Sequence, residues 1–276
     1  MRNFSISEDC MELIVCLKQI LDPEAPPDSY TIDQEANRIF LPPEIAPVIS
    51  TFDETALEAA LRLKDTHGGR ITALSMGNKF VSDVIKKALA VGADELILLE
   101  DVSFEGGDAW STAYALAEAI KKIGRYDIIF CGRQAADWDS GLVGAGIAEL
   151  LGLPSVTLAK KVDITDKTVT VERVAGDGFE IVKVPIPCLI TVSNELGELR
   201  LVRLKGVRRA EKIQPTVWKP EDIGADPSRI GSRGRLTTLH KLFKPVKETQ
   251  CEIIEGEDVA EAAVNLTLRL REAKLL

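Results

Sequence analysis

The sequence predicts an α/β fold with a doubly wound, mainly parallel, Rossmann-like sheet, followed by an antiparallel β extension and a C-terminal arm. Three patterns along the 276 residues support this prediction. Apolar runs of strand length alternate with amphipathic helical segments through the first 150 residues. After Pro154, β-branched runs separated by short polar turns replace that alternation. From residue 213 the chain is irregular until one last amphipathic segment.

The first 150 residues are predicted to supply the parallel part of the sheet. Near-continuous apolar runs are typical of strands buried on both faces, whereas apolar residues three to four positions apart indicate helices packed on one face. Glycines such as Gly77 and Gly92 close these segments. The predicted strands are 12–18, 70–76, 95–99 and 127–131, and the predicted helices are 51–63, 81–91, 108–123 and 142–151.

The second half is predicted to begin with an antiparallel meander, which a further buried strand at 188–192 follows. The meander strands are 155–162, 168–174 and 180–184. A basic stretch comes next, at 199–212, and a final helix is predicted at 258–274.

Three segments organise the chain. Residues 1–10 form an N-terminal extension, residues 11–212 form the α/β domain, and residues 213–276 form an arm too poor in apolar periodicity to build its own core. The arm is therefore expected to lie along the α/β domain or a second subunit. Within the domain, the long proline-rich loop at 22–50, with a short hairpin around 30–32 and 38–41, is of a length that usually serves function.

Composition narrows the class of protein. A net charge of −9 and a pI of about 5.0 argue against nucleic-acid binding. The five cysteines show no metal-binding spacing or disulfide framework, so Cys16, Cys131 and Cys188 are interpreted as small core residues. No apolar run approaches the ~20 residues that cross a bilayer, and residues 1–10 do not resemble a signal or transit peptide. We therefore expect a cytoplasmic protein without direct membrane insertion.

The segment 130–144 is the predicted ligand site. It joins an apolar strand to a loop of small and polar residues and then to a helix, and in open α/β sheets this junction holds anionic ligands such as phosphate. The other expected walls are the ends of the first two strands and the start of the first helix, at Cys16 to Lys18, Met76 to Gly77, and Ser50 to Asp53. Of the two carboxylates in the loop, Asp139 is expected to cap the following helix, whereas the role of Asp137 is left open.

The residues predict a nucleotide site without catalytic groups. The chain has no phosphate loop, no glycine-rich dinucleotide fingerprint after the first strand and no serine elbow. Its two histidines, His67 and His240, are both interpreted as surface residues. A site of this kind favours structural binding, signalling or electron transfer over bond-making chemistry.

Five segments together resemble one family. They are the strand end Cys16-Leu-Lys18, residues 52–64, residues 87–94, the loop Gly132-Arg-Gln-Ala-Ala-Asp-Trp-Asp139, and residues 171–180 leading to Pro187-Cys-Leu-Ile-Thr191. From Met11 to about Asp226 the chain resembles the β subunits of electron-transfer flavoproteins.

The resemblance implies a heterodimer with an electron-transfer flavoprotein α subunit, which holds most of the redox FAD and on which the C-terminal arm packs. It further implies an adenine-nucleotide-binding domain with a structural AMP in this subunit, or a second FAD in its place. Carried over by position, the cofactor-binding residues are Cys16, Lys18, Ser50, Phe52, Met76, Gly132, Gln134, Asp137, Asp139, Ser140, Gly141, Leu142, Val143 and Gly144.

The family's partner-recognition loop aligns with residues 194–212. Its anchoring leucine falls on Leu204, which would insert into a dehydrogenase while Arg203 and Lys205 steer the encounter. The implied function is transfer of electrons from flavin dehydrogenases, such as acyl-CoA dehydrogenases, to a quinone-linked oxidoreductase.

Three alternatives follow from the same residues. A bifurcating enzyme would oxidise NADH through a second FAD held here, and bulky Trp138 bears on whether that flavin fits. A stand-alone regulator of the stress-protein type would bind an adenine nucleotide as a homodimer. An adenylating ligase would require a phosphate loop after the first strand, which is missing.

Overall fold

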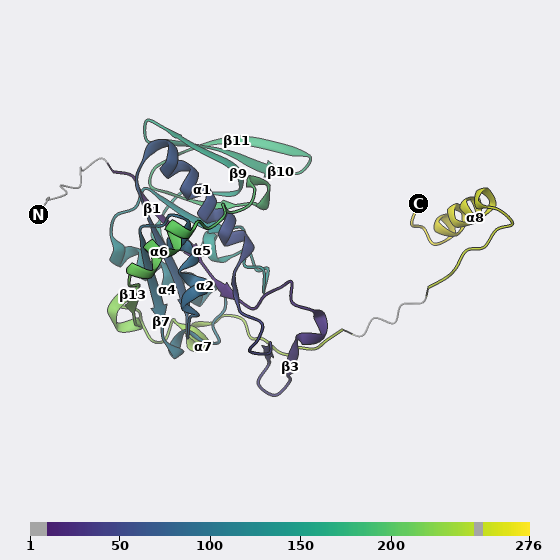
Figure 1. Cartoon of the computed structure of the whole chain (residues 1–276), viewed down its shortest axis with the longest axis horizontal. Coiled ribbons are helices and arrows are strands. Elements are labelled where there is room, and N and C mark those ends of the chain that lie inside the picture. Colours follow the sequence, from purple (N-terminus) through teal and green to yellow (C-terminus); the bar gives the residue numbers. More distant parts are fainter. Residues whose placement is uncertain (1–9, 246–250) are drawn as a thin grey trace, which may run out of the picture.

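One nine-stranded sheet organises the computed structural model, which describes residues 10–245 and 251–276 (Figure 1). The strand order is β11-β10-β9-β12-β8-β1-β6-β7-β13. Strands β1, β6, β7, β8, β12 and β13 pair in parallel, and β9 joins β12 in parallel before turning antiparallel to β10. The strands are β1 (Glu12–Leu17), β6 (Arg70–Gly77), β7 (Glu95–Glu100), β8 (Ile128–Gly132), β9 (Ser155–Thr165), β10 (Thr168–Ala175), β11 (Gly178–Pro185), β12 (Cys188–Val192) and β13 (Thr216–Trp218).

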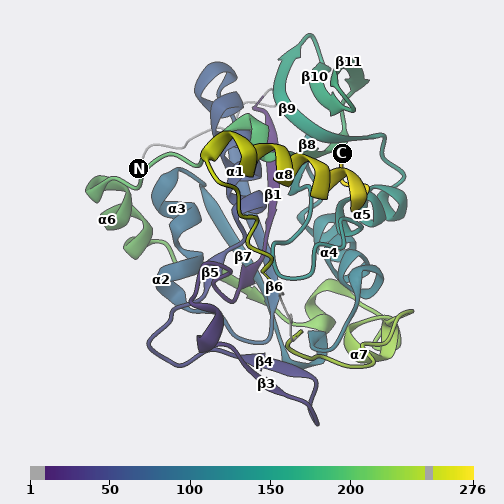
Figure 2. The ribbon, with the colours of Figure 1, turned by 90° about the vertical axis from the view of Figure 1, so that its right-hand side faces the viewer.

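Helices cover both faces of the parallel part, which confirms the doubly wound prediction (Figure 2). The helices are α1 (Thr51–His67), α2 (Ser82–Ile85), α3 (Lys87–Val91), α4 (Ala109–Ile123), α5 (Val143–Leu151), α6 (Leu204–Lys212), α7 (Gly231–Gly234) and α8 (Val259–Glu272).

Strand β1 lies at the centre of two apolar cores. Leu13, Val15 and Leu17 point into the core formed with α1, α2 and α3, whereas Ile14 and Cys16 point into the core formed with α4 and α5. Alternate residues of a strand face opposite sides, so a continuous apolar run is what a strand between two helical layers requires. The apolar run ends with β1 at Leu17, and the candidate site begins at the next residue, Lys18.

Two predicted helices differ in detail from the structure. Residues 81–91 form α2 and α3, which are separated at Lys86, instead of one helix. Helix α1 has Ser50 as its N-cap residue, but the Ser50 side chain does not bond to the helix. In contrast, Asp108 caps α4 with its side chain, in a reciprocal pair with Ser111.

The long loop between β1 and α1 contains the predicted hairpin. β3 (Thr31–Asp33) pairs antiparallel with β4 (Arg38–Phe40), and a second short pair joins β2 (Gln19–Ile20) to β5 (Val48–Ile49). The β2–β5 pair brings the two ends of the loop together beside the end of β1. Short 3-10 turns occur at Pro27–Ser29, Val102–Phe104, Asn194–Leu196 and Pro220–Ile223.

The stretch after α6 lies along the α/β domain as far as residue 245. β13 pairs with β7, so the sheet continues past residue 212, where the sequence analysis ended the domain. A strand of three residues has too little pattern to be seen in the sequence. Farther on, the backbone N–H of Asp226 donates to the Tyr114 hydroxyl at 3.0 Å, and the Arg229 guanidinium lies 3.9 Å from the centre of the Tyr114 ring.

Asp108 fastens the next part of this stretch to the domain. One carboxylate oxygen, Oδ1, caps α4 by accepting from the N–H groups of Trp110 and Ser111. The other, Oδ2, accepts from the N–H groups of Leu236 and Thr237 at 2.7 and 2.9 Å. Burial alone would raise the pKa of Asp108, but the N–H donors of Ser111, Thr237 and Leu236 outweigh burial and lower the pKa to about 2.

We expect Asp108→Ala to loosen residues 236–245 and to destabilise α4. Loss of the cap costs about 1 kcal/mol, and loss of the bonds to Leu236 and Thr237 adds about 1 kcal/mol or more. Because the folded pKa lies below the ordinary value of 3.8, this contribution is complete above about pH 4 and disappears as the pH falls through about 2. Urea unfolding measures the loss of stability, and amide exchange measures the loosening of residues 236–245. The control is Asp101→Ala, because the Asp101 side chain caps only the short turn at Val102–Phe104. Unchanged exchange at 236–245 would contradict the prediction.

Helix α8 buries none of its residues and lies apart from the sheet in Figure 1. Val264, Leu266 and Leu268 are each about half exposed. Residues 246–250, and residues 1–9 of the extension predicted at 1–10, lie outside the described residues. In the part of the chain that the structure describes, no helix is long and apolar enough to cross a membrane.

Candidate functional site

The predicted site lies on one rim of the sheet, at the carboxyl ends of β1, β6 and β8. Parallel pairing of β1 with β6 and β8 brings these ends to the same edge, beside the N-termini of α1 and α5. That edge is where open α/β sheets bind their ligands. The structure therefore brings together segments that are more than 100 residues apart in the sequence.

Asp53 is the buried centre of the rim. Its Oδ2 accepts from the N–H of Lys18 at 2.9 Å, and its Oδ1 accepts from the N–H of Gly132 at 3.2 Å. Asp53 is 7% exposed, and burial raises the pKa of its carboxyl group to about 7. One carboxyl group of α1 thus joins the end of β1 to the end of β8.

The loop after β8 is held over the rim by residues from two other elements. The Lys18 ammonium lies 2.6 Å from Oδ2 of Asp137. The role of Asp137, which the sequence left open, is therefore an ion pair with Lys18 in this structure. The Ser50 hydroxyl accepts from the N–H of Ala136 at 3.3 Å instead of capping α1. These contacts place a lysine cation and a helix N-terminus beside the loop.

Two further contacts order the loop itself. The Arg133 guanidinium lies 5.1 Å from the centre of the Phe52 ring, in cation–π geometry. Gln134 donates to Oδ1 of Asp139 at 2.7 Å. Arg133 was not among the predicted site residues. The sequence feature that could have identified it is a cationic residue directly after Gly132, the last residue of β8.

The expectation that Asp139 caps α5 is wrong. Its carboxylate accepts from Gln134 instead, and Asp139 has a φ of 51°, in the left-handed region. The N-cap residue of α5 is Leu142, whose side chain makes no cap bond, so among the described residues this helix start has no side-chain cap. Uncapped N-terminal amides are the groups that bind phosphate at this position in α/β folds.

Glycines allow the loop and α5 to approach the sheet. A Cβ atom on Gly132 would lie 2.5 Å from Oδ1 of Asp53 and 2.8 Å from the carbonyl carbon of Phe52. On Gly144 it would lie 2.7 Å from the Thr191 methyl group of β12. Both positions therefore exclude larger residues.

The remaining predicted residues divide into buried and exposed sets. Cys16 is 7% exposed, and both Cys16 and Cys131 are free thiols buried in the core. A hydrogen bond with Cys16 and burial raise the pKa of the Cys131 thiol well above its ordinary value, so Cys131 is not a nucleophile. Met76 is partly buried against the α4–α5 core. Ser140, Gly141 and Leu142 are exposed, and Val143 is partly buried.

The predicted partner residues occupy a different place. Arg203 precedes α6, and Leu204 and Lys205 begin it; Leu204 is 68% exposed. Helix α6 packs on α3, where Arg209 donates to the carbonyl groups of Leu89 and Ala93. Figure 2 shows α6 and α5 on opposite sides of the molecule, so the two predicted sets of residues lie on separate surfaces.

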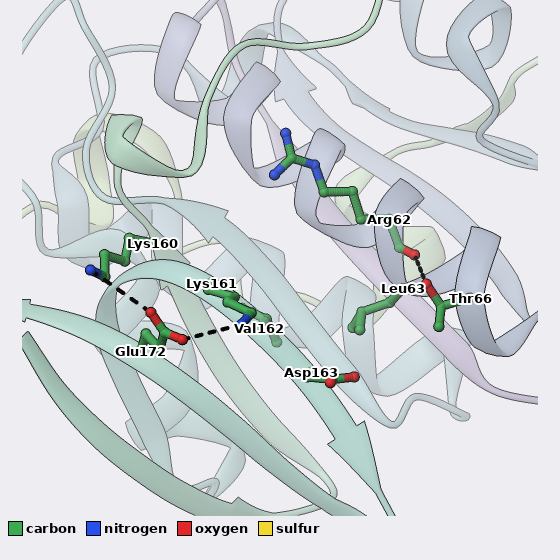
Figure 3. Close-up of a pocket in the computed structure, with 8 residues that line it drawn as sticks. All are labelled: Arg62, Leu63, Thr66, Lys160, Lys161, Val162, Asp163 and Glu172. Carbon is green, nitrogen blue, oxygen red and sulfur yellow. Dashed lines mark hydrogen bonds and ion pairs between the residues drawn. The ribbon is translucent and has the colours of Figure 1, made fainter.

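A separate pocket of about 420 Å³ lies between α1 and the β9–β10 ribbon (Figure 3). Its charged groups are already paired, since Glu172 lies 3.8 Å from the Lys160 ammonium and 3.2 Å from the Lys161 ammonium. Arg62 bonds to Glu58. The pocket contains none of the predicted site residues and is a solvated groove.

The described side chains of the rim are held mainly by contacts with one another and with backbone groups. Lys18 and Asp137 form an ion pair, and Asp53 accepts from backbone N–H groups. Both histidines lie elsewhere: His67, the last residue of α1, is paired with Asp163, and His240 lies in the arm. Within residues 10–245 and 251–276, no group of three or more His, Cys, Asp or Glu side chains could hold a metal ion. Fold and rim together define a doubly wound α/β protein whose ligand site is expected where the ends of parallel strands meet the starts of α1 and α5.

Comparison with known proteins identifies the family. The model of the electron transfer flavoprotein domain matches residues 44–223, which is more than half of the chain. The chain is 36% identical over 270 residues to the caffeyl-CoA reductase-Etf complex subunit CarD of Acetobacterium woodii, covering 96% of this chain and 100% of that protein. It is 36% identical over 263 residues to the electron transfer flavoprotein subunit beta of Clostridium acetobutylicum, covering 95% and 98%.

A third relative is the protein FixA of Azorhizobium caulinodans, 37% identical over 262 residues, with 91% of each chain covered. The chain belongs to the electron transfer flavoprotein family, and its function is electron transfer. The fold and the resemblance expected from the sequence are thereby confirmed.

Proposed function

We propose that the chain is the β subunit of a heterodimeric electron-transfer flavoprotein and binds a structural AMP on the rim. The observation that carries the nucleotide proposal is the N-terminus of α5. Within the described part of the chain no side chain caps it, it follows the exposed turn 140–142, and Gly144 brings it directly against β12. Lys18 adds a cation at the same rim. These groups fit a phosphate.

Each rim residue has a defined part in holding the nucleotide. Amides of Val143 and Gly144 meet the phosphate, Ser50 and Lys18 hold the loop in place, and Phe52 and Arg133 form one wall. FAD bound mainly by the α subunit would supply the redox chemistry. This chain's residues would hold the nucleotide in position and cover the cofactor, and they would transfer no proton to a substrate.

The second surface is proposed to meet dehydrogenases. Leu204 projects into solvent at the start of α6, beside the exposed Leu201 and Val202. Cations surround it at Arg203, Lys205 and Arg208. An exposed apolar anchor within a basic surface fits an acidic partner with an apolar pocket, such as an acyl-CoA dehydrogenase. The accepting protein would be a quinone-linked oxidoreductase.

The identity of the released nucleotides tests this function. The chain is purified together with its α-subunit partner, the complex is denatured, and the supernatant is analysed by chromatography and mass spectrometry. We expect one FAD and one AMP per heterodimer. A homodimer without flavin would refute the proposal and support a stand-alone regulator instead.

A second candidate is a bifurcating complex in which FAD replaces AMP in this subunit. The rim itself favours it, since Trp138 is 56% exposed and residues 139–142 are also exposed, leaving the phosphate side uncovered by the described residues. Two FAD per heterodimer and reduction of the complex by NADH would establish this candidate. Retention of AMP without any reaction with NADH would exclude it.

The proposed setting is the cytoplasm. The described cysteines are all free, and three of the five are buried in the sheet. Free thiols are typical of a reducing compartment. Fractionation of cells that produce the complex at its natural level tests this setting.

A further inference from the structure

A buried carboxyl group connects the segments that form the nucleotide rim. Asp53 lies in the first turn of α1, and its two oxygens face two different strand ends. Oδ2 meets the N–H of Lys18 just after β1, and Oδ1 meets the N–H of Gly132 at the end of β8. Both bonds use a carboxyl oxygen as acceptor, and an ionised carboxylate, which only accepts, suits this arrangement better than a protonated carboxyl group, which carries one O–H.

The surroundings leave little room for another arrangement. A Cβ atom at Gly132 would lie 2.5 Å from Oδ1, which shows how closely the carboxylate approaches β8. Lys18 and Gly132 each lead directly into a nucleotide wall: Lys18 pairs with Asp137, and Gly132 begins the loop to α5. Movement of either strand end would therefore move the loop.

We propose that Asp53 is a positioning residue whose ionised carboxylate holds the ends of β1 and β8 at the spacing that the nucleotide needs, and that binding of a proton releases this spacing. A protonated carboxyl group would place an O–H against one of the two N–H groups, so one bond is lost. The inference rests on the proposed nucleotide site and adds proton control to it. Asp53 itself acts through Lys18 and Gly132.

The charged groups around Asp53 set the pH range. Burial raises the pKa of Asp53 to about 7, against the lowering effects of the Lys18 and Gly132 N–H groups and of the Lys18 charge. The negative charge of Asp137, from the loop after β8, raises the pKa of Asp53 further. Cys131 of β8 also faces the carboxyl group, but it remains a neutral thiol because its own pKa is raised well above the ordinary value. The proton is therefore taken up near neutral pH.

The wild-type complex tests the proposal through its affinity for AMP. After removal of bound nucleotide, titration calorimetry measures binding between about pH 8 and about pH 6. At one pH unit below the pKa about nine-tenths of the carboxyl groups are protonated, so we expect the dissociation constant for AMP to rise about tenfold. Unfolding does not explain such a rise in the dissociation constant. Because the pKa of Asp53 in the folded state lies above the ordinary 3.8, proton uptake by Asp53 stabilises the folded protein as the pH falls from about 7 to about 4.

The variant Asp53→Asn separates this effect from ionisation of the AMP phosphate, which also occurs near pH 6. The amide retains one acceptor and cannot titrate, so binding should be weaker at every pH and should show only the phosphate's dependence. Asp226→Asn is the matched control, since Asp226 also accepts a backbone N–H, from Ser228, but lies outside the rim. It should keep the wild-type profile.

A measurement on the wild type needs no substitution. The amide resonances of Lys18 and Gly132 should titrate with the same midpoint as AMP affinity. Resonances that remain constant while affinity changes, or a folded Asp53→Asn complex with the wild-type profile, would overturn the proposal. A wild-type complex that binds neither AMP nor FAD at any pH would instead refute the nucleotide site itself.

Discussion

Replacing Gly144 by valine is expected to strip the nucleotide from the complex and to lower its stability. A single Cβ atom at this position would already lie 2.7 Å from the Thr191 methyl group and 3.5 Å from Cβ of Cys131. Valine adds two further methyl groups, so α5 must move away from β8 and β12. Overpacking of this kind costs about 1–3 kcal/mol. Displacement of the helix N-terminus also removes the amides proposed to hold the phosphate.

The experiment measures nucleotide content and urea unfolding of the purified complex. Gly178→Val is the matched control, because Gly178 begins the edge strand β11 and has nothing within 4 Å of its Cβ position. Valine is favoured in strands, so the control should retain its nucleotide and its stability. Gly144→Ala, with one added carbon, should be intermediate. A destabilised Gly144→Val complex that keeps a full complement of nucleotide would place the nucleotide elsewhere.

Replacing Leu204 by alanine is expected to slow electron transfer from the dehydrogenase without loss of flavin. Leu204 is 68% exposed at the first position of α6, and it contributes nothing to either core cluster. Exposed apolar residues that anchor an interface contribute about 2 kcal/mol, which corresponds to a fall of roughly 30-fold in kcat/KM. Folding stability should change by less than about 0.5 kcal/mol.

Steady-state transfer at several dehydrogenase concentrations and the flavin absorbance of the purified complex are the two measurements. Val102→Ala provides the control, since Val102 is 70% exposed but lies near the sheet rim, away from α6. Neutralisation of Lys205 should lower the association rate and its salt dependence more than the final affinity. If Leu204→Ala lowers flavin content instead of transfer, Leu204 has a structural role.

The parallel sheet could be predicted from local pattern. Residues 13–17 of β1 are all apolar because helices cover both sides of this strand, and such a run is visible in consecutive residues of the sequence. Helix ends were equally readable, since Asp108 begins α4 and Gly92 ends α3. The antiparallel ribbon of β9, β10 and β11 followed from its β-branched runs and turn residues.

Side-chain partners across the rim could not be predicted in the same way. Ser50 and Asp139 each had the residue type and position of a helix cap, yet Ser50 bonds to the loop at Ala136 and Asp139 to Gln134. A local rule gives the groups that a side chain can reach within one turn, whereas the fold brings in competing partners from distant segments. β13 was missed for a related reason, because three residues gain strand structure only by pairing with β7.

The sequence by itself determined the alternation of elements, the position of the rim and the family, because these depend on periodicity and on motifs within short segments. Only the tertiary structure decided what the rim residues do. It joined Lys18 to Asp137, left the N-terminus of α5 without a side-chain cap, and placed Asp53 between two strand ends. Burial and distance between remote segments set the charge of such a carboxyl group, and neither property exists until the chain has folded.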